Sequence, residues 1–450
     1  MVLRYRSFSS EACASVSRTS ATTLVDGGTD RLLTVRHLRV AGSNRYIGQM
    51  MAQAAVAVHG ADAGPHAAPD NTVQRARARW FSTHHPVLDE RMRGIGDVFG
   101  VDPDDERWDL GRLGPIETSP GCSAVFHPGD RTATGHALLG RNFDFPTGTY
   151  SEITGGPART GERPLAADVW VTELRPDNGY ATIVVGIMDM LGGIDGLNEA
   201  GLAVTLLADN ESPAPEPSVV PQAGLSEQQV VRYILETCQD VEEAKQALLL
   251  AKQYYLFVPC HFLVADRAGR SFTWEYSPGH NREHIVETTP GESLVCTNHL
   301  LHRWPDPAHL PDDRSSAGTA AFTYDRWRAL DAQIGRGSAP DVAQVRSQID
   351  GVRFTYPAPG VRTLWQAVYD LEETAIEVAF FAGDRDGTSR YTEPIRFQLA
   401  SQDQPCATPI AAAAPRHGVR EAAHSYQPGP STPSPNPPGS ADTDYAAAVG

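Results

Sequence analysis

The sequence is short of cysteine, lysine and long apolar runs. Its 450 residues include six cysteines and only two lysines, Lys245 and Lys252. Six widely spaced cysteines are too few for a disulfide-built scaffold, and no apolar run reaches the roughly 18 residues that a membrane helix needs. The first residues include arginines but lack the apolar stretch of a secretory signal. These absences predict free thiols, no membrane span and a cytoplasmic location.

Positive charge is also scarce. Lys and Arg number 38 against 55 Asp and Glu, which gives a formal net charge of −17. A protein that binds nucleic acid needs a basic face to neutralise phosphates, and attachment to an anionic membrane needs a polybasic patch. The charge balance therefore predicts neither a nucleic-acid partner nor a membrane partner.

Several common catalytic and ligand-binding motifs are missing. The sequence has no G-x-S-x-G elbow, no P-loop, no G-x-G-x-x-G after a strand and no H-E-x-x-H. Two Cys/His pairs remain as candidate metal ligands. Cys260 and His261 are adjacent, so on a strand they point to opposite faces. Cys296 and His299 form a C-x-x-H pair with no second half nearby, whereas zinc needs three or four ligands. We therefore predict no metal site.

The pattern along the chain predicts one working domain between two tails. Residues 1–30 are Ser/Thr-rich without periodicity, and residues 401–450 are rich in Pro, Ser, Gly and Ala, so both are expected to be disordered. Within residues 31–400, short β-branched runs separated by Gly, Pro and Asp predict strands that mostly meet as hairpins, which indicates an α+β chain with largely antiparallel sheets. Apolar periodicity predicts helices in 45–60, 73–100, 226–252, 322–335 and 341–350.

A glycine–cysteine step at residues 121–122 opens one of the predicted strands. A thiol becomes a strong nucleophile only as the thiolate, so it needs a base. If the chain is cut between Gly121 and Cys122, the new α-amino group lies on the nucleophile's own residue. The unperturbed pKa of such a group is about 7.7–8.0, which suits a general base. The alternative is that Cys122 is a buried, inert thiol.

Two further segments provide polar groups for such a thiol. In "GRNFDF" (140–145), Arg141 could stabilise a thiolate or a substrate carboxylate, and Asp144 could hold the new ammonium group. Strand alternation places these two side chains on opposite faces, so both can reach Cys122 only through a bulge or the strand end. Asn298 in "CTNH" offers an amide donor for a developing oxyanion. The alternatives are a structural Arg141–Asp144 ion pair and a turn role for Asn298.

The ordered motifs resemble a known family. The chain is similar to the acyl-coenzyme A:6-aminopenicillanic acid acyltransferase (isopenicillin N acyltransferase) family of cysteine N-terminal nucleophile hydrolases. The resemblance covers most of 40–398. It rests on "RYIGQMMAQAA", "RGIGDVFG", "GCSAVF", "GRNFDF", "GLNEAGLAV", "CTNH", "DRWRAL" and "RTLWQAVYDL" in the family's order. It implies a four-layer αββα sandwich with two mostly antiparallel sheets. It also implies a precursor that cleaves itself into segments 31–121 and 122–400, which stay together as two chains.

The resemblance also implies residue roles. Cys122 is the expected nucleophile, Asp144 orients its free amino group, and Asn298 stands in the oxyanion hole. "GRNFDF" is closer to the related bile-salt hydrolases, in which the Arg and Asp of this motif line the site. Their second asparagine corresponds here to Ala208, with Asp209 and Asn210 as loose substitutes. Asn198 and Arg326 are tentative substrate-binding residues, although a turn role for Asn198 and a solvated helix face for Arg326 are the competing interpretations.

The expected function is that of an autoproteolytic cysteine amide hydrolase or acyltransferase. The expected partner is a small-molecule acyl amide or thioester, and the reaction passes through an acyl-Cys122 intermediate. No cofactor is expected, with acyl-coenzyme A as a candidate acyl donor. Two alternatives stay open at this point. One is a thioesterase or acyl-amino-acid hydrolase that uses the same site, and the other is an uncleaved, non-catalytic small-molecule binding protein.

Overall fold

A computed structural model provides the structure of the protein. It describes the residues in the ranges 17–26, 32–68, 70–113, 121–149, 151–152, 156–157, 161–187, 189–212, 223–255, 259–277, 282–313, 322–336, 338–354 and 360–399. The C-terminal segment 401–450, which the sequence predicts to be a tail, lies outside them.

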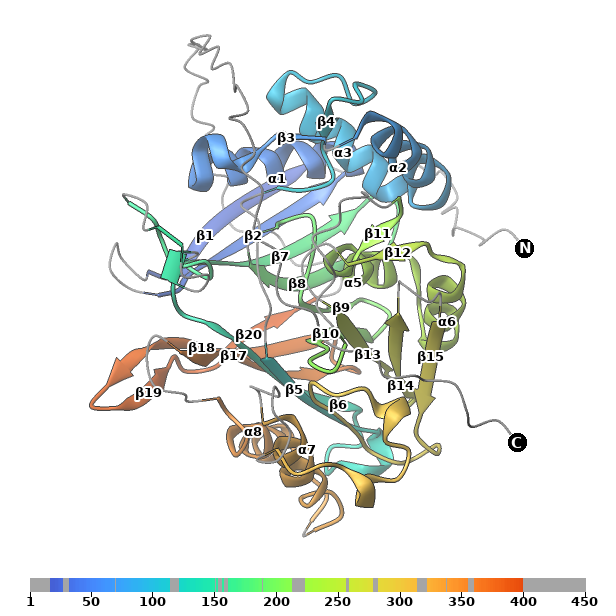
Figure 1. Cartoon of the computed structure of the whole chain (residues 1–450), viewed down its shortest axis with the longest axis vertical. Coiled ribbons are helices and arrows are strands. Elements are labelled where there is room, and N and C mark those ends of the chain that lie inside the picture. The colour runs from blue at the N-terminus through green and yellow to red at the C-terminus, as the bar shows by residue number, and fades with distance from the viewer. Residues whose placement is uncertain are drawn as a thin grey trace, which may run out of the picture. The chain divides into compact units, whose positions relative to one another are not determined.

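The larger sheet has nine strands (Figure 1). Strands β2 and β7 pair in parallel over nine residues, and every other pair in this sheet is antiparallel. In spatial order the strands are β1 (Arg18–Val25), β2 (Thr34–Gly42), β7 (Asp168–Pro176), β8 (Thr182–Ile187), β9 (Asp195–Asn198), β10 (Leu202–Ala208), β13 (Cys260–Asp266), β14 (Ser271–Ser277) and β15 (Arg282–Glu287).

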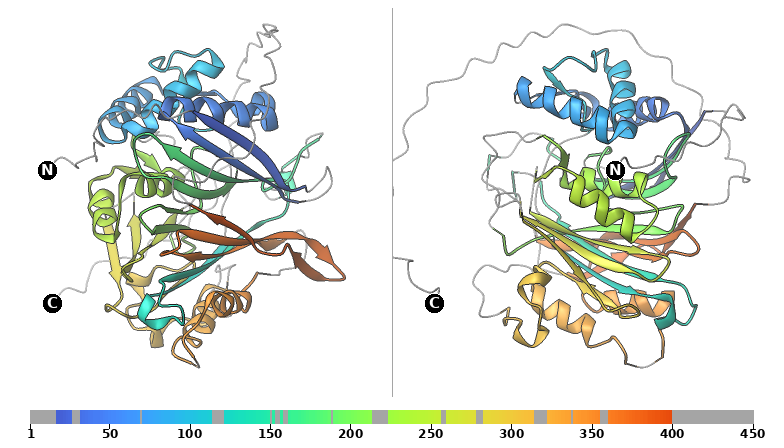
Figure 2. Two further views of the ribbon diagram at one scale, coloured as in Figure 1. Left: turned by 180° about the vertical axis from the view of Figure 1, so that it is seen from behind. Right: turned by 90° about the vertical axis from the view of Figure 1, so that its right-hand side faces the viewer.

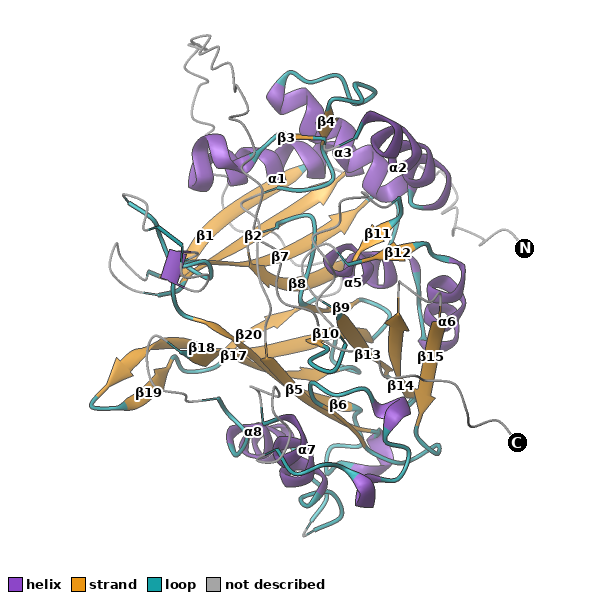
Figure 3. Cartoon of the chain, in the orientation of Figure 1, coloured by secondary structure: helices purple, strands orange, loops and turns teal. Residues whose placement is uncertain are grey.

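The second sheet has seven strands, all paired antiparallel (Figure 3). In spatial order they are β16 (Leu294–Cys296), β5 (Gly121–His127), β6 (Leu138–Pro146), β17 (Val361–Asp370), β18 (Ala375–Arg385) and β19 (Thr388–Tyr391), while β20 (Ile395–Gln398) also pairs with β18. Two short pairs stand apart, β3 (His66–Ala67) with β4 (Trp108–Asp109) and β11 (Leu225–Ser226) with β12 (Gln253–Tyr254). The antiparallel pairs β13–β14 and β17–β18 are hairpins of the kind that the sequence pattern predicts.

The helices largely follow the apolar periodicity. They are α1 (Asn44–His59), α2 (Asn71–His84), α3 (Pro86–Phe99), α5 (Glu227–Thr237), α6 (Val241–Leu250), α7 (Thr323–Asp331) and α8 (Val342–Asp350), with 3₁₀ turns η1 (Gly60–Ala63), η2 (Gly129–Arg131), η3 (Leu301–Arg303) and η4 (Pro307–His309). Ser226 and Gln229 form a capping box at the start of α5. The segment 73–100, expected to be helical throughout, is instead two helices, because Pro86 lacks an N–H and displaces His85 from helical geometry.

These elements form layers, and three apolar clusters lie between the layers (Figure 2). One cluster joins helices α1, α2, α3, α5 and α6 to one face of the nine-stranded sheet. A second joins the other face of that sheet to the seven-stranded sheet. The third packs α7 and α8 against the outer face of the seven-stranded sheet. The molecule is therefore an α+β protein in which the space between the sheets is a separate core.

The structure differs from the sequence prediction at the N-terminal end. Residues 18–25, inside the expected tail 1–30, form strand β1, which pairs antiparallel with β2. The run "RTSATTLV" holds three threonines and a valine, and β-branched residues favour a pleated strand. Ser/Thr content alone therefore misled the prediction. None of the helices in the described part of the chain combines the length and the apolar character that crossing a bilayer requires.

Candidate active site

The register of β5 on β6 places Cys122. Gly121 lies opposite Asp144, Cys122 opposite Phe143, and Ala124 opposite Arg141. Cross-strand partners share a face, and alternate residues along a strand share it too. The Cys122 thiol therefore points into the core between the sheets, on the same face as Arg141. The side chain of Cys122 is fully buried.

Arg141 approaches the thiol and is held by an aspartate from the opposite sheet. Its Nε donates to Asp195 Oδ1 at 2.5 Å, and its Nη2 donates to the Leu206 carbonyl oxygen at 2.7 Å. The Cys122 thiol faces the same carbonyl at 3.7 Å. Trp365 Nε1 donates to the other Asp195 oxygen at 2.7 Å. Arg141 therefore pairs with Asp195 rather than with Asp144.

The backbone of Cys122 is held by side chains at the strand end, beyond the last ladder pair of β16. Its N–H donates to Asn298 Oδ1 at 2.8 Å, and its carbonyl oxygen accepts from Arg326 Nη1 at 2.7 Å. The Arg326 guanidinium also donates to Asp144 Oδ2 at 3.0 Å and to Asn298 Oδ1 at 2.6 Å. One buried arginine thus joins the cysteine backbone, the aspartate and the asparagine. The solvated-face interpretation of Arg326 is wrong, because α7 packs this side chain against β5.

This arrangement settles the question of strand alternation. Arg141 and Asp144 do lie on opposite faces of β6, as alternation requires. Arg141 lies near the thiol on the inner face, whereas Asp144 is joined to the Cys122 carbonyl oxygen through Arg326. No bulge in the β5–β6 ladder is needed. The Arg141–Asp144 ion pair that the sequence offered as an alternative is not present, since Asp144 pairs with Arg326.

Burial shifts the pKa of the Asp144 carboxyl and the pKa of the Cys122 thiol. Burial raises the pKa of Asp144 to about 6, while Arg326 and a 2.5 Å hydrogen bond from Thr363 oppose the rise. Burial also raises the pKa of the Cys122 thiol, against a lowering effect of Arg141. At neutral pH the carboxylate is therefore mainly ionised and the thiol is neutral. A neutral thiol needs a base before it can attack a carbonyl.

Asn298 has a different partner from the one an oxyanion role requires. Its side-chain Nδ2 donates to the Ala208 carbonyl oxygen at 2.8 Å. Its backbone carbonyl oxygen accepts from the Asn210 N–H at 2.9 Å. Asp209 is used locally, since its Oδ1 accepts from the backbone N–H groups of Glu211 and Ser212. In this structure Asn298 therefore binds the Cys122 amide through Oδ1, and its donor is already engaged.

Asn198 lies apart from this cluster. Its Nδ2 donates to the carbonyl oxygens of Leu235 and Cys238, and its Oδ1 accepts from the N–H groups of Ala200 and Leu202. The side chain is fully buried. All its hydrogen-bonding positions serve the turn after β9 and the end of α5. The structure thus supports the turn interpretation and not the tentative substrate-binding one.

The Cys260–His261 pair behaves as strand geometry predicts. Cys260 packs in the core under the helices, while His261 points between the sheets. Elsewhere, ligand-type atoms of His136, Asp370 and Glu372 lie within 4.8 Å of one another. His136 Nδ1 already pairs with Asp370 at 2.9 Å, and this group lies at the opposite end of β6 from Cys122.

Sequence reasoning missed Asp195 and Thr363. Asp195 shares the inward face of β9 with Leu197. A charged residue in an otherwise apolar inward pattern is a signal of a buried ion pair. Thr363 lies opposite Asp144 across the β6–β17 ladder, a pairing that the sequence does not reveal.

A buried cysteine at a strand end, held by an asparagine and an arginine, defines a thiol site in an α+β protein. The family model for acyl-coenzyme A:6-aminopenicillanic acid acyltransferase matches residues 131–382. The match covers more than half of the chain, so the protein belongs to this family. It includes Arg141, Asp144, Asn298 and Arg326, and it begins after Cys122.

Solved structures give weaker likenesses. A cysteine-to-alanine mutant of the conjugated bile acid hydrolase from Clostridium perfringens is 15% identical, with 61% of this chain and 92% of that chain covered and a TM-score of 0.39. Penicillin V acylase from Agrobacterium tumefaciens is 20% identical, with 58% and 82% covered and a TM-score of 0.36. The N-acylethanolamine-hydrolyzing acid amidase orthologue from Caenorhabditis elegans is 15% identical, with 56% and 93% covered and a TM-score of 0.32. At TM-scores this low the likenesses carry no structural argument. A comparison with curated protein sequences gives no match.

Proposed function

We propose that the protein is an autoproteolytic cysteine amide hydrolase or acyltransferase that acts on small-molecule acyl amides or thioesters. The observation that carries the proposal is the convergence of Asn298 and Arg326 on the backbone of Cys122, beside Asp144. Beyond the end of β16 the buried N–H and carbonyl of Cys122 need side-chain partners in any case. One of these partners, Arg326, also pairs with the buried carboxylate of Asp144, the group expected to orient a free α-amino group. Membership of an acyltransferase family supports the same reaction class.

In the proposed maturation, the Cys122 thiol attacks the Gly121 carbonyl carbon. The Gly121–Cys122 C–N bond breaks, the nitrogen takes up a proton and becomes the α-amino group, and water then hydrolyses the resulting thioester. Gly121 suits this step because it adds no side chain beside the carbonyl. A Cβ at this position would lie 3.4 Å from the Asp144 Cβ and 3.9 Å from Asn298 Oδ1, so residue 121 lies beside both side chains.

In the proposed turnover, the new α-amino group accepts the thiol proton and the thiolate attacks the substrate carbonyl. The leaving amine or thiol takes that proton as the acyl-Cys122 thioester forms. Water or an acceptor amine, deprotonated by the same amino group, then releases the acyl group. Asp144 orients the ammonium form, and Arg141 stabilises the thiolate. Asn298 serves as the oxyanion donor if its Nδ2 leaves the Ala208 carbonyl.

The layer order supports an assignment to the αββα sandwich of the N-terminal nucleophile hydrolases. We propose that no cofactor takes part, with acyl-coenzyme A as a candidate acyl donor, and that the two chains act together. A cytoplasmic location stays a prediction from composition. The thioesterase and acyl-amino-acid hydrolase alternatives use the same site and differ only in the substrate.

The first test is the intact mass of the purified protein under denaturing conditions. We expect two species whose masses correspond to a cut between Gly121 and Cys122, and one uncut species for the Cys122→Ala variant. The matched control is Cys238→Ala, which removes another buried thiol and should be cut like the wild type. A single uncut wild-type chain that also fails to turn over acyl amides and thioesters would instead favour the non-catalytic binding protein.

A further inference from the structure

The segment after β16 carries Asn298, and it leaves the sheet at that point. The last ladder pair of β16 is Cys296 with Ala124, so the backbone from Thr297 onward needs other partners. Asn298 N–H donates to Thr323 Oγ1 at 2.8 Å. The Thr297 carbonyl oxygen accepts from His261 Nε2 at 2.7 Å. The position of Asn298 therefore depends on side chains rather than on strand pairing.

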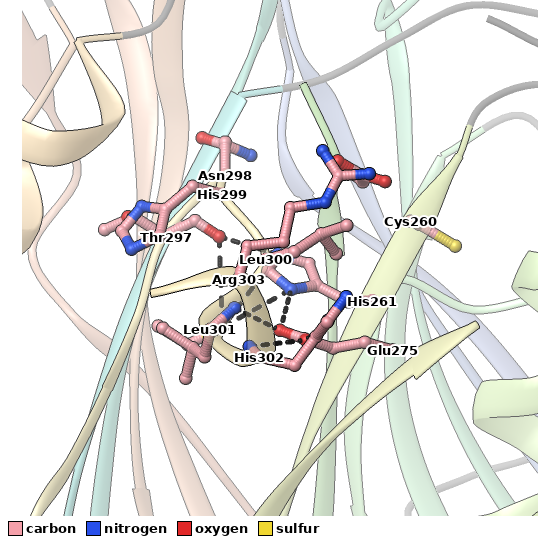
Figure 4. A network of polar contacts seen from close by, with 12 residues as sticks. Cys260, His261, Glu275, Thr297, Asn298, His299, Leu300, Leu301, His302 and Arg303 are labelled. Carbon is pink, nitrogen blue, oxygen red and sulfur yellow. Dashed lines mark hydrogen bonds and ion pairs between the residues drawn. The ribbon is translucent and has the colours of Figure 1, made fainter. Parts of the chain in front are cut away.

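His261 belongs to the opposite sheet and is held there by Glu275. The two residues are direct cross-strand partners on β13 and β14, and His261 Nδ1 lies 3.5 Å from Glu275 Oε1. The hydrogen bond from His261 to Thr297 therefore links the nine-stranded sheet to the segment that follows β16 of the seven-stranded sheet. Figure 4 shows His261 between Glu275 and the backbone of this segment.

Glu275 also fixes the far end of the same segment. Its carboxylate accepts from the Leu301 N–H at 2.6 Å, the His302 N–H at 3.0 Å and His302 Nδ1 at 2.5 Å. The Glu275 carboxylate therefore orients His261, whose partner Thr297 precedes Asn298. The same carboxylate also binds η3, which follows Asn298. The dashed lines in Figure 4 trace these contacts. His302 borders a pocket of about 410 Å³ that Glu275, Arg282, His284 and Arg303 also line.

The hydrogen bond to Thr297 determines that the Nε2 atom of His261 carries a proton. A carbonyl oxygen can only accept, so His261 Nε2 carries a hydrogen toward Thr297. Both His261 and Glu275 are almost completely buried. Burial lowers the pKa of His261, but Cys296 and Glu275 outweigh this effect and raise that pKa well above its usual range. A buried charge that is paired and hydrogen-bonded holds its partners in one geometry.

We infer that His261, oriented by Glu275, is a positioning residue that keeps Asn298 against the Cys122 amide by fixing the Thr297 carbonyl. This role deepens the proposed function and rests on it, because Asn298 matters chemically only if Cys122 reacts. Within the described residues no hydrogen bond links His261 to the Cys122 thiol, so its role is one of positioning. Loss of its hydrogen bond leaves the Thr297 carbonyl oxygen without this partner and lets the adjoining Asn298 shift. A displacement of about 1 Å in a positioned group can cost about 100-fold in rate.

The test compares His261→Ala and His261→Gln with the wild type. Gln places an amide N–H close to the Nε2 position, so it can still donate to the Thr297 carbonyl, whereas Ala cannot. We expect kcat to fall about 100-fold in His261→Ala and by about tenfold or less in His261→Gln, with KM nearly unchanged in both. A change in KM alone, or an equal fall in kcat in the two variants, would overturn the positioning role.

A second measurement does not depend on catalysis. Hydrogen exchange, followed by mass spectrometry on peptides that cover Thr297–His302, should be about tenfold faster in His261→Ala than in the wild type or His261→Gln. The control is His284→Gln, which replaces a ring that stacks on His302 at 3.7 Å without a bond to this backbone. Unchanged exchange in His261→Ala would overturn the inference. If His261→Ala does not fold, His261→Asn takes its place, because the shorter amide does not reach Thr297.

These readouts keep the two proposals distinct. A wild-type protein without turnover or self-cleavage contradicts the proposed function, while the exchange data still decide whether His261 fixes the segment. A catalytically active wild type whose kcat and exchange are unaffected by His261→Ala contradicts only the positioning role.

Discussion

At the scale of single residues, the site depends on which face of a strand each group occupies. The Cys122 thiol lies between the sheets with Arg141, while its backbone N–H and carbonyl bind Asn298 and Arg326 at the strand end. This division separates two tasks. The inner face provides positive charge near the sulfur, and the side chains at the strand end hold the nitrogen that would become the free amino group.

Replacement of Cys122 tests the nucleophile. Cys122→Ala should lower acyl amide and thioester turnover by at least about 1000-fold, because no other described thiol lies in this cluster and loss of a nucleophile removes the covalent route. Steady-state assays with a panel of acyl amides and thioesters measure the loss. Cys238→Ala should retain wild-type turnover. Activity that survives in Cys122→Ala would exclude the thiol mechanism.

The pH dependence of self-cleavage tests Asp144. Its pKa is raised to about 6, mainly by burial, so the carboxyl is protonated below this pH and ionised above it. The ionised carboxylate would stabilise the positive charge that develops on the Cys122 nitrogen as the C–N bond breaks, so the cleavage rate should rise with pH through about 6. The rate can be followed by the intact mass of freshly synthesised chain at a series of pH values.

The matched variant for this experiment is Asp144→Asn. It removes the titration at nearly constant size, so its cleavage should be slow and should lack the rise near pH 6. A wild-type profile that is flat across this range, or an Asp144→Asn profile that keeps the rise, would assign the ionisation to another group.

At the scale of elements, the helical cap depends on close approach of two helices. Gly48 of α1 and Gly94 of α3 face the opposite helix so closely that an added Cβ would lie 2.1 Å from the Arg91 carbonyl oxygen and 2.0 Å from the Arg45 carbonyl oxygen, respectively. Real Cβ atoms do not occupy such distances, so the backbones would have to separate. These two glycines therefore set the spacing of α1 and α3 above the nine-stranded sheet.

Substitution of Gly94 tests this packing. Gly94→Ala should lower the free energy of unfolding by about 1–3 kcal/mol or more, as overpacking does elsewhere. Urea denaturation measures the change. Gly351→Ala is the control, because its Cβ would make only ordinary contacts, the nearest at 3.4 Å from the Gln348 carbonyl oxygen. Equal stability of Gly94→Ala and the wild type would mean that the helices can move apart without cost.

The elements also show where local sequence patterns succeed. The capping box at Ser226 and the hairpins β13–β14 and β17–β18 were predictable, because each is determined by neighbours in the chain. The break at Pro86 follows from the same local rules, although apolar periodicity by itself predicts one continuous helix. Strand β1 was missed because its partner β2 supplies the stabilisation that the segment lacks alone.

At the scale of the whole molecule, a cut before Cys122 would divide the helix-covered core between two chains. Strand β2 and helices α1 to α3 precede the cut, yet β2 pairs with β7 over nine residues and Arg91 forms a buried ion pair with Glu236. The helices share an apolar cluster with α5 and α6. The N-terminal segment is therefore an integral part of the fold rather than a removable extension.

The cleaved protein should consequently stay associated. We expect both chains to elute together in native size-exclusion chromatography and to separate only in denaturant, because dissociation would expose the cluster under the helices to water. Denaturing mass spectrometry of the single native peak identifies both chains. Recovery of the C-terminal chain alone in a native, active peak would contradict this expectation.

The sequence by itself determined the α+β class, the largely antiparallel hairpins and the candidates Cys122, Arg141, Asp144 and Asn298, because strand periodicity, turn residues and motif order are local properties. Only the tertiary structure decided that Arg141 pairs with Asp195, that Arg326 joins Cys122 to Asp144, and that His261 reaches Thr297. Each of these contacts joins residues from different elements. The first crosses from one sheet to the other, and the last reaches from the nine-stranded sheet to the segment after β16. Their partners are set by sheet order and register, which depend on the packing of the whole chain.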